Sequence, residues 1–198
     1  LRPGLDRQSY AIQKRTLEED GFAWNGAWEP ALQHLGYEVQ SLYVNVEPLQ
    51  KAWAAENGAA RPQIGWMEQI ARCQLEAFQP NLLFLDYLAV FRRPWLDAMR
   101  SACPELRLIL GFSGVYLNDF ETIRACDAIF SCARRPVEHF RKGGGRAFML
   151  RHAFNPAVLQ SLPPPAEPLG EVVFAGSIAR GAGSHLEREQ LIETLVGT

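Results

Sequence analysis

The chain has 198 residues, 47% of them hydrophobic, so it can bury a full core and is long enough for one large domain or for one domain with part of another. Acidic and basic residues nearly cancel at a formal net charge of −2, which disfavours nucleic acid and an anionic membrane surface as partners. No apolar stretch approaches the roughly 20 residues that a membrane-spanning helix requires.

The first third of the chain predicts helices and one strand. Residues 37–44 alternate between apolar and polar side chains, as a strand does. Helices are predicted at residues 9–20, 27–35, 48–56 and 65–78. A nucleotide-binding domain usually opens with a buried strand, and no continuous apolar run precedes Gly36. Either that strand lies upstream of Leu1 or the fold begins with helices.

The middle of the chain alternates regularly between short apolar runs and helical patterns. Strands are predicted at residues 81–86, 106–112, 128–131 and 147–150, and helices between them at 94–103, 120–126 and 136–142. This alternation is typical of an α/β protein with a doubly wound, Rossmann-like parallel sheet.

A proline-rich segment follows the predicted sheet. Pro163, Pro164, Pro165 and Pro168 cannot lie inside a helix or a central strand, and they favour an extended spacer. We therefore assign residues 1–152 to a Rossmann-like domain and residues 153–170 to a linker. Residues 171–178 form an apolar run that closes in Gly-Ser, and 185–196 have a helical pattern. We interpret residues 171–198 as the first strand and helix of an incomplete second Rossmann-like domain.

The turn after this last predicted strand is a candidate phosphate site. Gly176 and Ser177 would present free amides at the start of the helix, where the helix dipole attracts anions. Arg180 could pair with a diphosphate through two guanidinium donors. The segment is not a Walker loop, and its glycines also suit an ordinary flexible connection.

Further candidates follow the strands of the first domain, because ligands of open parallel sheets bind beyond the carboxyl ends of the strands. Asp86 and His152 are candidate catalytic residues, as a base or hydroxyl ligand and as an acid–base group. Asp86 could instead cap the following turn, and His152 could hydrogen-bond the backbone. Ser113 and Gly114 are candidate substrate contacts, although Gly114 also suits a turn that needs a positive φ.

Trp24 is a candidate platform for stacking on a sugar ring, together with Trp28, because the two flank a glycine in an irregular segment. Packing in the core is the alternative for both. His34 and His139 fall on helical patterns and are interpreted as surface or packing residues.

The cysteines give no sign of a metal site. The four cysteines are scattered without the close pairing of zinc ligands, which indicates reduced thiols. Residues 1–6 lack the apolar core of a signal peptide. The sequence therefore predicts a cytoplasmic protein without a metal cofactor.

Several short segments occur in a recognisable order: Asp-Gly-Phe-Ala-Trp at 20–24, Leu-Gln-His-Leu-Gly-Tyr-Glu-Val at 32–39, Pro-Leu-Gln-Lys-Ala-Trp at 48–53, Gln-Pro-Asn-Leu-Leu at 79–83, Asp-Ala-Ile-Phe-Ser at 127–131, Arg-His-Ala-Phe-Asn-Pro at 151–156 and Val-Val-Phe-Ala-Gly-Ser at 172–177. Together they resemble the amino-terminal, acceptor-side domain and the start of the donor domain in glycosyltransferases of the two-Rossmann-domain (GT-B) architecture. Within that group the chain is most similar to the bacterial spore-maturation and spore-coat glycosyltransferase-like proteins.

The resemblance implies an enzyme that moves a sugar from a nucleotide-diphosphate sugar, its co-substrate, to a hydroxyl of a glycan or small-molecule acceptor. It implies that Gly176 and Ser177 form the donor-phosphate loop. The chain as given stops short of the family's acidic donor-binding motif, so we expect this stretch alone to be inactive. Many retaining relatives place a histidine after the strand that ends at Phe112, where this chain has Ser113 and Gly114. A non-catalytic Rossmann-like module that binds a ligand or a protein is the alternative.

Overall fold

The computed structural model describes residues 3–21, 24–60, 64–86, 88, 90–153, 155, 158–159, 163 and 185–196. The chain divides into two compact units, Leu1–Gln160 and Ser161–Thr198. In the second unit, helix α9 covers His185–Val196, where the sequence predicts a helix. The strand predicted at residues 171–175 lies outside the described residues.

The first unit contains a four-stranded sheet in which all neighbouring strands are parallel. Its strands are β1 (Leu82–Leu85), β2 (Leu108–Phe112), β3 (Ala128–Ser131) and β4 (Ala147–Met149), in the spatial order β1-β2-β3-β4. The crossover helices are α5 (Arg93–Ala102), α6 (Phe120–Ala125) and α7 (Arg134–Lys142). The predicted α/β class with a parallel, Rossmann-like sheet is confirmed. Among the described strands the spatial order follows the chain without reversal, so a doubly wound arrangement stays a prediction.

The sheet buries most of one face and less of the other. Leu83, Leu85, Ile109 and Ile129 alternate with less buried residues and pack into the main apolar core with α5, α6 and α7. Gly111 of β2 packs closely there, because a Cβ at this position would lie 2.8 Å from Cδ2 of Leu88 and would force that side chain to shift. A run of apolar residues with one buried face is what a short parallel strand needs in order to hold its register.

A carboxylate also fixes the start of β2. Oδ2 of Asp127 accepts hydrogen bonds from the amide of Ile109 at 2.7 Å and from Nη2 of Arg100 at 2.6 Å. Burial alone would raise the pKa of Asp127, but these two hydrogen bonds lower it below its ordinary value. Asp127 therefore links β2, α5 and the turn before β3.

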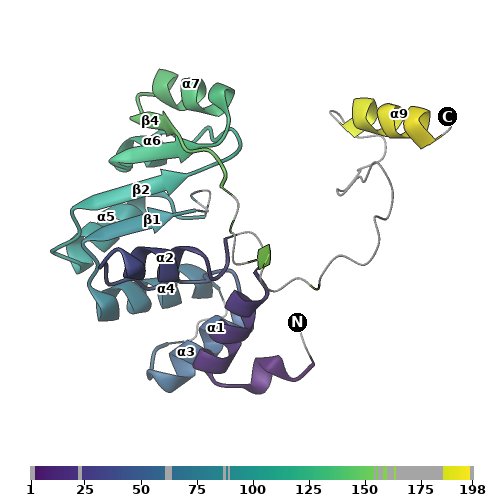
Figure 1. The fold of residues 1–198 in the computed structure, drawn as a ribbon. Coiled ribbons are helices and arrows are strands. Elements are labelled where there is room, and N and C mark those ends of the chain that lie inside the picture. The colour runs from purple at the N-terminus through teal and green to yellow at the C-terminus, as the bar shows by residue number, and fades with distance from the viewer. Residues whose placement is uncertain are drawn as a thin grey trace. The chain divides into compact units, whose positions relative to one another are not determined.

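The N-terminal part of the first unit is helical. A short 3₁₀ helix, η1 (Leu5–Arg7), precedes α1 (Tyr10–Glu19), α2 (Trp28–His34), α3 (Glu47–Glu56) and α4 (Trp66–Phe78). Pro48 lies in the first turn of α3, where its missing amide costs nothing. These helices lie on the side of β1, whereas α7 lies beside β4 (Figure 1). No helix in the described ranges has the length and apolar character needed to cross a membrane.

The strand predicted at residues 37–44 is wrong. These residues have no strand partner in the structure, and two of their amides, those of Tyr37 and Ser41, bond to other groups. The amide of Tyr37 donates to the carbonyl oxygen of Leu32 at the end of α2, and the amide of Ser41 donates to Oε2 of Glu29 at 2.8 Å. Leu42 and Val44 still pack against the main core, which explains the apolar alternation that suggested a strand.

Candidate functional site

The loops that follow the strands share one edge of the sheet. Because all four strands are parallel, Asp86 after β1, Ser113 after β2, Arg134 after β3 and His152 after β4 lie at their carboxyl ends. This edge, which we call the carboxyl edge, is where open parallel sheets bind ligands. The parallel topology therefore places the candidates Asp86, Ser113 and His152 at one edge of the sheet.

Five ring side chains meet at the carboxyl edge, and we call them the aromatic cluster: Trp24, Trp28, Phe84, Phe112 and His152. The ring centroid of Trp24 lies 5.0 Å from that of Phe112 and 5.7 Å from those of Trp28 and His152. Trp28 also lies 5.7 Å from Phe84, and Phe112 lies 6.1 Å from His152. The structure thus joins two of the predicted site residues, Trp24 and His152, although they are far apart in the sequence.

The aromatic cluster lies on the less buried face of the sheet. Phe84 and Phe112 alternate with Leu85 and Gly111, whose side of the sheet faces the main core. Phe112 is buried, Trp24 is half-buried, and Trp28 and His152 are exposed. A ring surface that is open on one side and supported from below can stack on a flat apolar ligand surface, such as the face of a sugar ring.

A hydrogen-bond network holds the loop that carries Trp24 and Trp28. The amide of Gly26 donates to the hydroxyl of Tyr43 at 3.2 Å, and that hydroxyl donates to Oε1 of Glu18 at 3.3 Å. Gly26 has φ 67°, and a Cβ there would lie 2.6 Å from the carbonyl oxygen of Glu18, so only glycine fits. The loop between α1 and α2 is therefore tied to both α1 and Tyr43.

Lys14 is the cation at the centre of this network. Its Nζ lies 2.7 Å from Oε1 of Glu18 and 2.9 Å from Oε2 of Glu29, and the same Glu29 oxygen accepts the amide of Ser41. Burial alone would lower the pKa of Lys14, but the hydrogen bonds to both glutamates outweigh it and raise that pKa. For Glu29, burial opposes ionisation, and the hydrogen bonds from Lys14 and Ser41 lower its pKa nonetheless.

Tyr43 is the neutral member of this network. Burial raises the pKa of its hydroxyl to about 12, with the nearby Glu18 adding to the rise. Its hydroxyl hydrogen is therefore retained at neutral pH and stays available to Glu18. Lys14 and Glu18 precede the two tryptophans in sequence, Glu29 and Tyr43 follow them, and together these groups hold the loop that carries Trp24.

Asp86 differs from the other carboxylates described so far. Its side chain stays open to solvent on one side, yet the protein around it removes enough water to raise its pKa above the ordinary value. A hydrogen bond involving its own backbone opposes that rise. A carboxyl group with a raised pKa at the carboxyl edge is suited to accept a proton from a ligand hydroxyl.

Ser113 and Gly114 have structural explanations. The hydroxyl of Ser113 donates to the carbonyl oxygen of Val115 at 2.9 Å and accepts the amide of Val115 at 3.3 Å, so it is occupied within its own turn. Gly114 is exposed and is not among the described glycines with positive φ, so the turn does not need glycine for that reason. A Cβ at Gly114 would meet only Sγ of Cys132, at an ordinary 3.6 Å.

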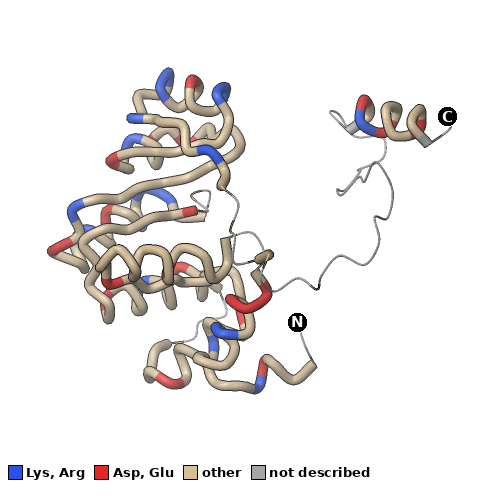
Figure 2. The backbone as a smooth tube through the Cα atoms, in the orientation of Figure 1, with Lys and Arg blue, Asp and Glu red and all other residues tan. Residues whose placement is uncertain are grey.

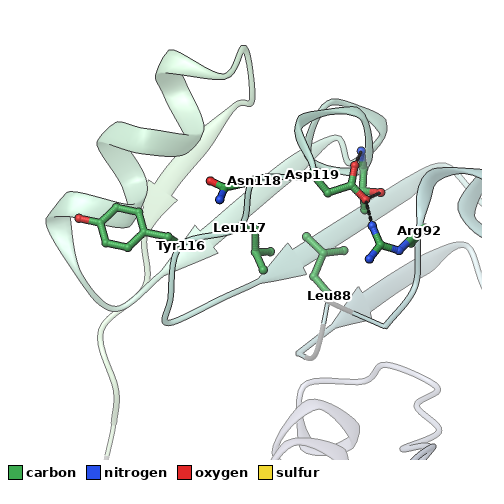
Figure 3. Close-up of a pocket in the computed structure, with 7 residues that line it drawn as sticks. Leu88, Arg92, Tyr116, Leu117, Asn118 and Asp119 are labelled. Atoms are coloured by element: carbon green, nitrogen blue, oxygen red, sulfur yellow. Dashed lines mark hydrogen bonds and ion pairs between the residues drawn. The ribbon is translucent and has the colours of Figure 1, made fainter. Parts of the chain in front are cut away.

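A pocket of about 510 Å³ opens between the loops that follow β1 and β2 (Figure 3). Leu88 and Leu117 provide its apolar lining, and Tyr116 and Asn118 lie at one end. At the other end Nη1 of Arg92 pairs with Oδ2 of Asp119 at 3.0 Å (Figure 3). The pocket contributes residues that the sequence analysis did not select.

At the polar end of this pocket, side-chain contacts of Asp119 and Thr122 connect the two loops; we call this set of contacts the clasp. Asp119 accepts the amide of Thr122 at 3.1 Å and the hydroxyl of Thr122 at 2.8 Å, which caps α6. The Thr122 hydroxyl in turn accepts the amide of Arg93 at the start of α5. Burial disfavours the charge on Asp119, but hydrogen bonds from Thr122 and then from Arg92 lower its pKa. The Asp-x-x-Thr spacing is the only sequence signal that could have pointed to this clasp.

The remaining candidates divide into two groups. Gly176, Ser177 and Arg180 lie outside the described residues. His34 is exposed near the end of α2, and His139 of α7 packs between the rings of Tyr116 and Phe120 while Nε2 donates to the carbonyl oxygen of Leu117 at 2.9 Å. The interpretation of both histidines as surface or packing residues is confirmed.

Comparison of the chain with protein-family models gave no match, and searches of curated proteins and of solved structures gave no significant match either. In the part of the chain that the structure describes, His, Cys, Asp and Glu side chains form no group of three or more that could hold a metal ion. The four cysteines are free thiols.

Proposed function

We propose that this chain is the acceptor-side part of a glycosyltransferase, which moves a sugar from a nucleotide-diphosphate sugar to a hydroxyl group. The observation that carries the proposal is the aromatic cluster at the carboxyl edge, where the ring centroids of Trp24 and His152 lie 5.7 Å apart. Asp86 follows β1 at the same edge of the sheet. A group of aromatic rings that includes a titratable imidazole suits a ligand with apolar ring faces and hydroxyl edges, which describes a sugar.

In this proposal each residue has a separate task. Trp24 and Trp28 stack on the acceptor sugar, and Asp86 or His152 accepts the proton of the attacking hydroxyl. The hydroxyl oxygen forms the new bond to the anomeric carbon as the bond from that carbon to the diphosphate oxygen breaks. The family resemblance adds Gly176 and Ser177, with Arg180, as the groups that stabilise the leaving diphosphate through amides and a guanidinium. The proposal includes no metal cofactor.

Two features of the structure bear on Asp86 and Ser113. A raised pKa makes Asp86 a stronger base than an ordinary aspartate once it is ionised. Ser113 is occupied by its own turn, so its contribution to substrate binding would come through the position of the loop and not through a free hydroxyl. Gly114 is exposed beside that loop, so a ligand could approach its backbone there.

Ligand-observed NMR with the chain tests the proposal. In saturation-transfer experiments with a panel of methyl glycosides, we expect transfer to the ring C–H protons of at least one sugar, because those protons face the aromatic cluster in a stacked complex. Trp24→Ala should abolish that transfer. Tyr37→Ala is the matched control, since Tyr37 is an exposed aromatic side chain that makes no ring contact within the described residues.

Three outcomes would count against the proposal. Absence of transfer to every glycoside would remove the acceptor site. Transfer that survives Trp24→Ala would move the sugar elsewhere on the surface. If sugars bind but calorimetry with uridine, guanosine and thymidine diphosphates gives flat traces in a protein with a complete second domain, the non-catalytic binding module becomes the better account.

A further inference from the structure

The charges of the first unit are segregated, although the whole chain is nearly neutral. Lys and Arg positions are frequent on α7 and at the end of the sheet that carries β4, and few acidic positions accompany them (Figure 2). The basic residues of this region are Arg124, Arg134, Arg135, Arg141, Lys142, Arg146 and Arg151, and all are exposed. We call this set the basic face. The acidic residues in the same stretch of chain are Glu121, Asp127 and Glu138, and Asp127 is already paired with Arg100.

The basic face follows from the geometry of α7. Pro136, Val137 and Phe140 are buried against the sheet, which leaves Arg134, Arg135, Arg141 and Lys142 on the outward side. No described carboxylate forms an ion pair with any residue of the basic face. Their positive charge is therefore directed at whatever approaches this surface.

Two of these arginines are fixed in place by backbone carbonyls. Nε of Arg141 donates to the carbonyl oxygen of Ala147 at 2.8 Å, and Nη1 of Arg124 donates to that of Gly143 at 2.9 Å. Neither bond neutralises the guanidinium. Held side chains lose less entropy when they bind an anion than free ones do.

An exposed apolar loop tip lies beside the basic face. Val115 is 67% exposed and Tyr116 is 55% exposed, in the loop between β2 and α6. The ring of Tyr116 packs edge-on against that of His139 in α7, with centroids 5.1 Å apart, which fixes the tip next to the helix. An aliphatic and a phenolic side chain at one protruding tip, next to arginines, suit the boundary between lipid headgroups and acyl chains.

We propose that the basic face and the Val115–Tyr116 tip dock this protein onto anionic lipid headgroups at a membrane surface. Arg and Lys attract the negative surface potential, and the tip inserts its apolar atoms at the interface. The aliphatic tip favours a lipid surface over nucleic acid, whose recognition relies on aromatic platforms for bases and on phosphate contacts. The net charge of −2 gives no hint of this because the acidic residues lie elsewhere in the chain.

Sedimentation of the full chain with lipid vesicles tests the proposal. Phosphatidylcholine vesicles that contain phosphatidylglycerol should bind the protein, and vesicles of phosphatidylcholine alone should not. Binding should weaken as salt is added, because screening shortens the range of the attraction. The double variant Arg134→Ser with Arg135→Ser should weaken binding about 25-fold, at about fivefold for each charge removed.

Two further variants separate charge from insertion. Arg15→Ser with Lys51→Ser removes the same charge from exposed positions on α1 and α3 and should leave binding unchanged. Val115→Ser should weaken binding severalfold without changing its salt dependence. Circular dichroism of each variant verifies that it is folded.

Three results would overturn the proposal. These are equal binding to neutral and anionic vesicles, an unchanged affinity in the Arg134→Ser, Arg135→Ser variant, and tighter binding to a single-stranded RNA oligonucleotide than to anionic vesicles. None of these measurements depends on sugar binding, so docking and the proposed transferase function can fail independently.

Discussion

The sheet with α5 to α7 and the N-terminal helices α1 to α4 are stabilised in different ways. The sheet side shares a large core that is almost entirely apolar, including Leu96, Ile109 and Phe140. The N-terminal side has a small core of Trp53, Ala54 and Ile70, supplemented by ion pairs. It also buries side-chain atoms of Tyr10, Gln50 and Gln74 that have no hydrogen-bond partner among the described residues.

The two regions therefore hold the candidate site by different kinds of contact. An apolar core without polar partners to satisfy gives the strands a fixed register, and the carboxyl edge inherits that rigidity. The loop that brings Trp24 to that edge depends instead on Lys14, Glu29 and Tyr43, whose contacts are directional and pH-dependent. The sheet with its apolar core positions the candidate acid–base groups Asp86 and His152. The N-terminal helices, with their polar network, position the tryptophans of the aromatic cluster.

Phe140→Ala should have the largest effect, because it removes a fully buried ring from the apolar side. Phe140 is 0% exposed, and truncating a buried Phe costs about 3–5 kcal/mol of unfolding free energy. Phe148→Ala is the control, since Phe148 is 44% exposed and should cost far less. Chemical denaturation of both variants checks this, and similar losses in the two would show that the open face of the sheet is packed as tightly as the other.

Lys14→Met should have an intermediate effect on the polar side. It leaves Glu18 and Glu29 half-buried and close together without their cation, and we expect a loss of about 2 kcal/mol in unfolding free energy. Adding Glu29→Gln to Lys14→Met should recover part of that loss. If Lys14→Met alone is as stable as the wild type, the network does not support the Trp24 loop.

Asp86→Asn should have the smallest effect, and its sign is the opposite. The raised pKa of Asp86 means that the folded state resists its ionisation, so the ionised group costs stability at neutral pH. The variant should therefore unfold at a slightly higher temperature than the wild type at neutral pH. The difference should vanish as the pH falls below the ordinary range of aspartate, where both folded and unfolded chains carry the proton. Equal melting temperatures at neutral pH would mean that Asp86 is fully hydrated.

The sequence predicts the sheet side well and the polar side poorly. All four strands and their crossover helices are found where apolar runs and helical periodicity place them, because burial of one face leaves a regular pattern. The segment at residues 37–44 has the same pattern for another reason. Leu42 and Val44 fill the core while a glutamate side chain, and not a strand, takes the amide of Ser41. Side-chain capture of an amide leaves no periodic signal.

The candidate site was predictable to a similar degree. Position after a strand identified Asp86 and His152, and the irregular glycine segment identified Trp24. Phe84 and Phe112 resemble ordinary strand residues in the sequence. Only the structure shows that their rings contact those of Trp28 and Trp24. Ser113 has a suitable position, but only the structure shows that its hydroxyl is used by Val115.

The central claim is that the aromatic cluster binds a sugar, and NMR of the tryptophan indole N–H groups tests it with internal controls. The chain has five tryptophans, of which Trp24 and Trp28 belong to the cluster whereas Trp53, Trp66 and Trp95 lie in or against the helical packing. Titration with a glycoside that binds should shift the indole signals of Trp24 and Trp28 and leave the other three in place. Shifts confined to the other three, or no shift at any concentration of any glycoside, would contradict the claim.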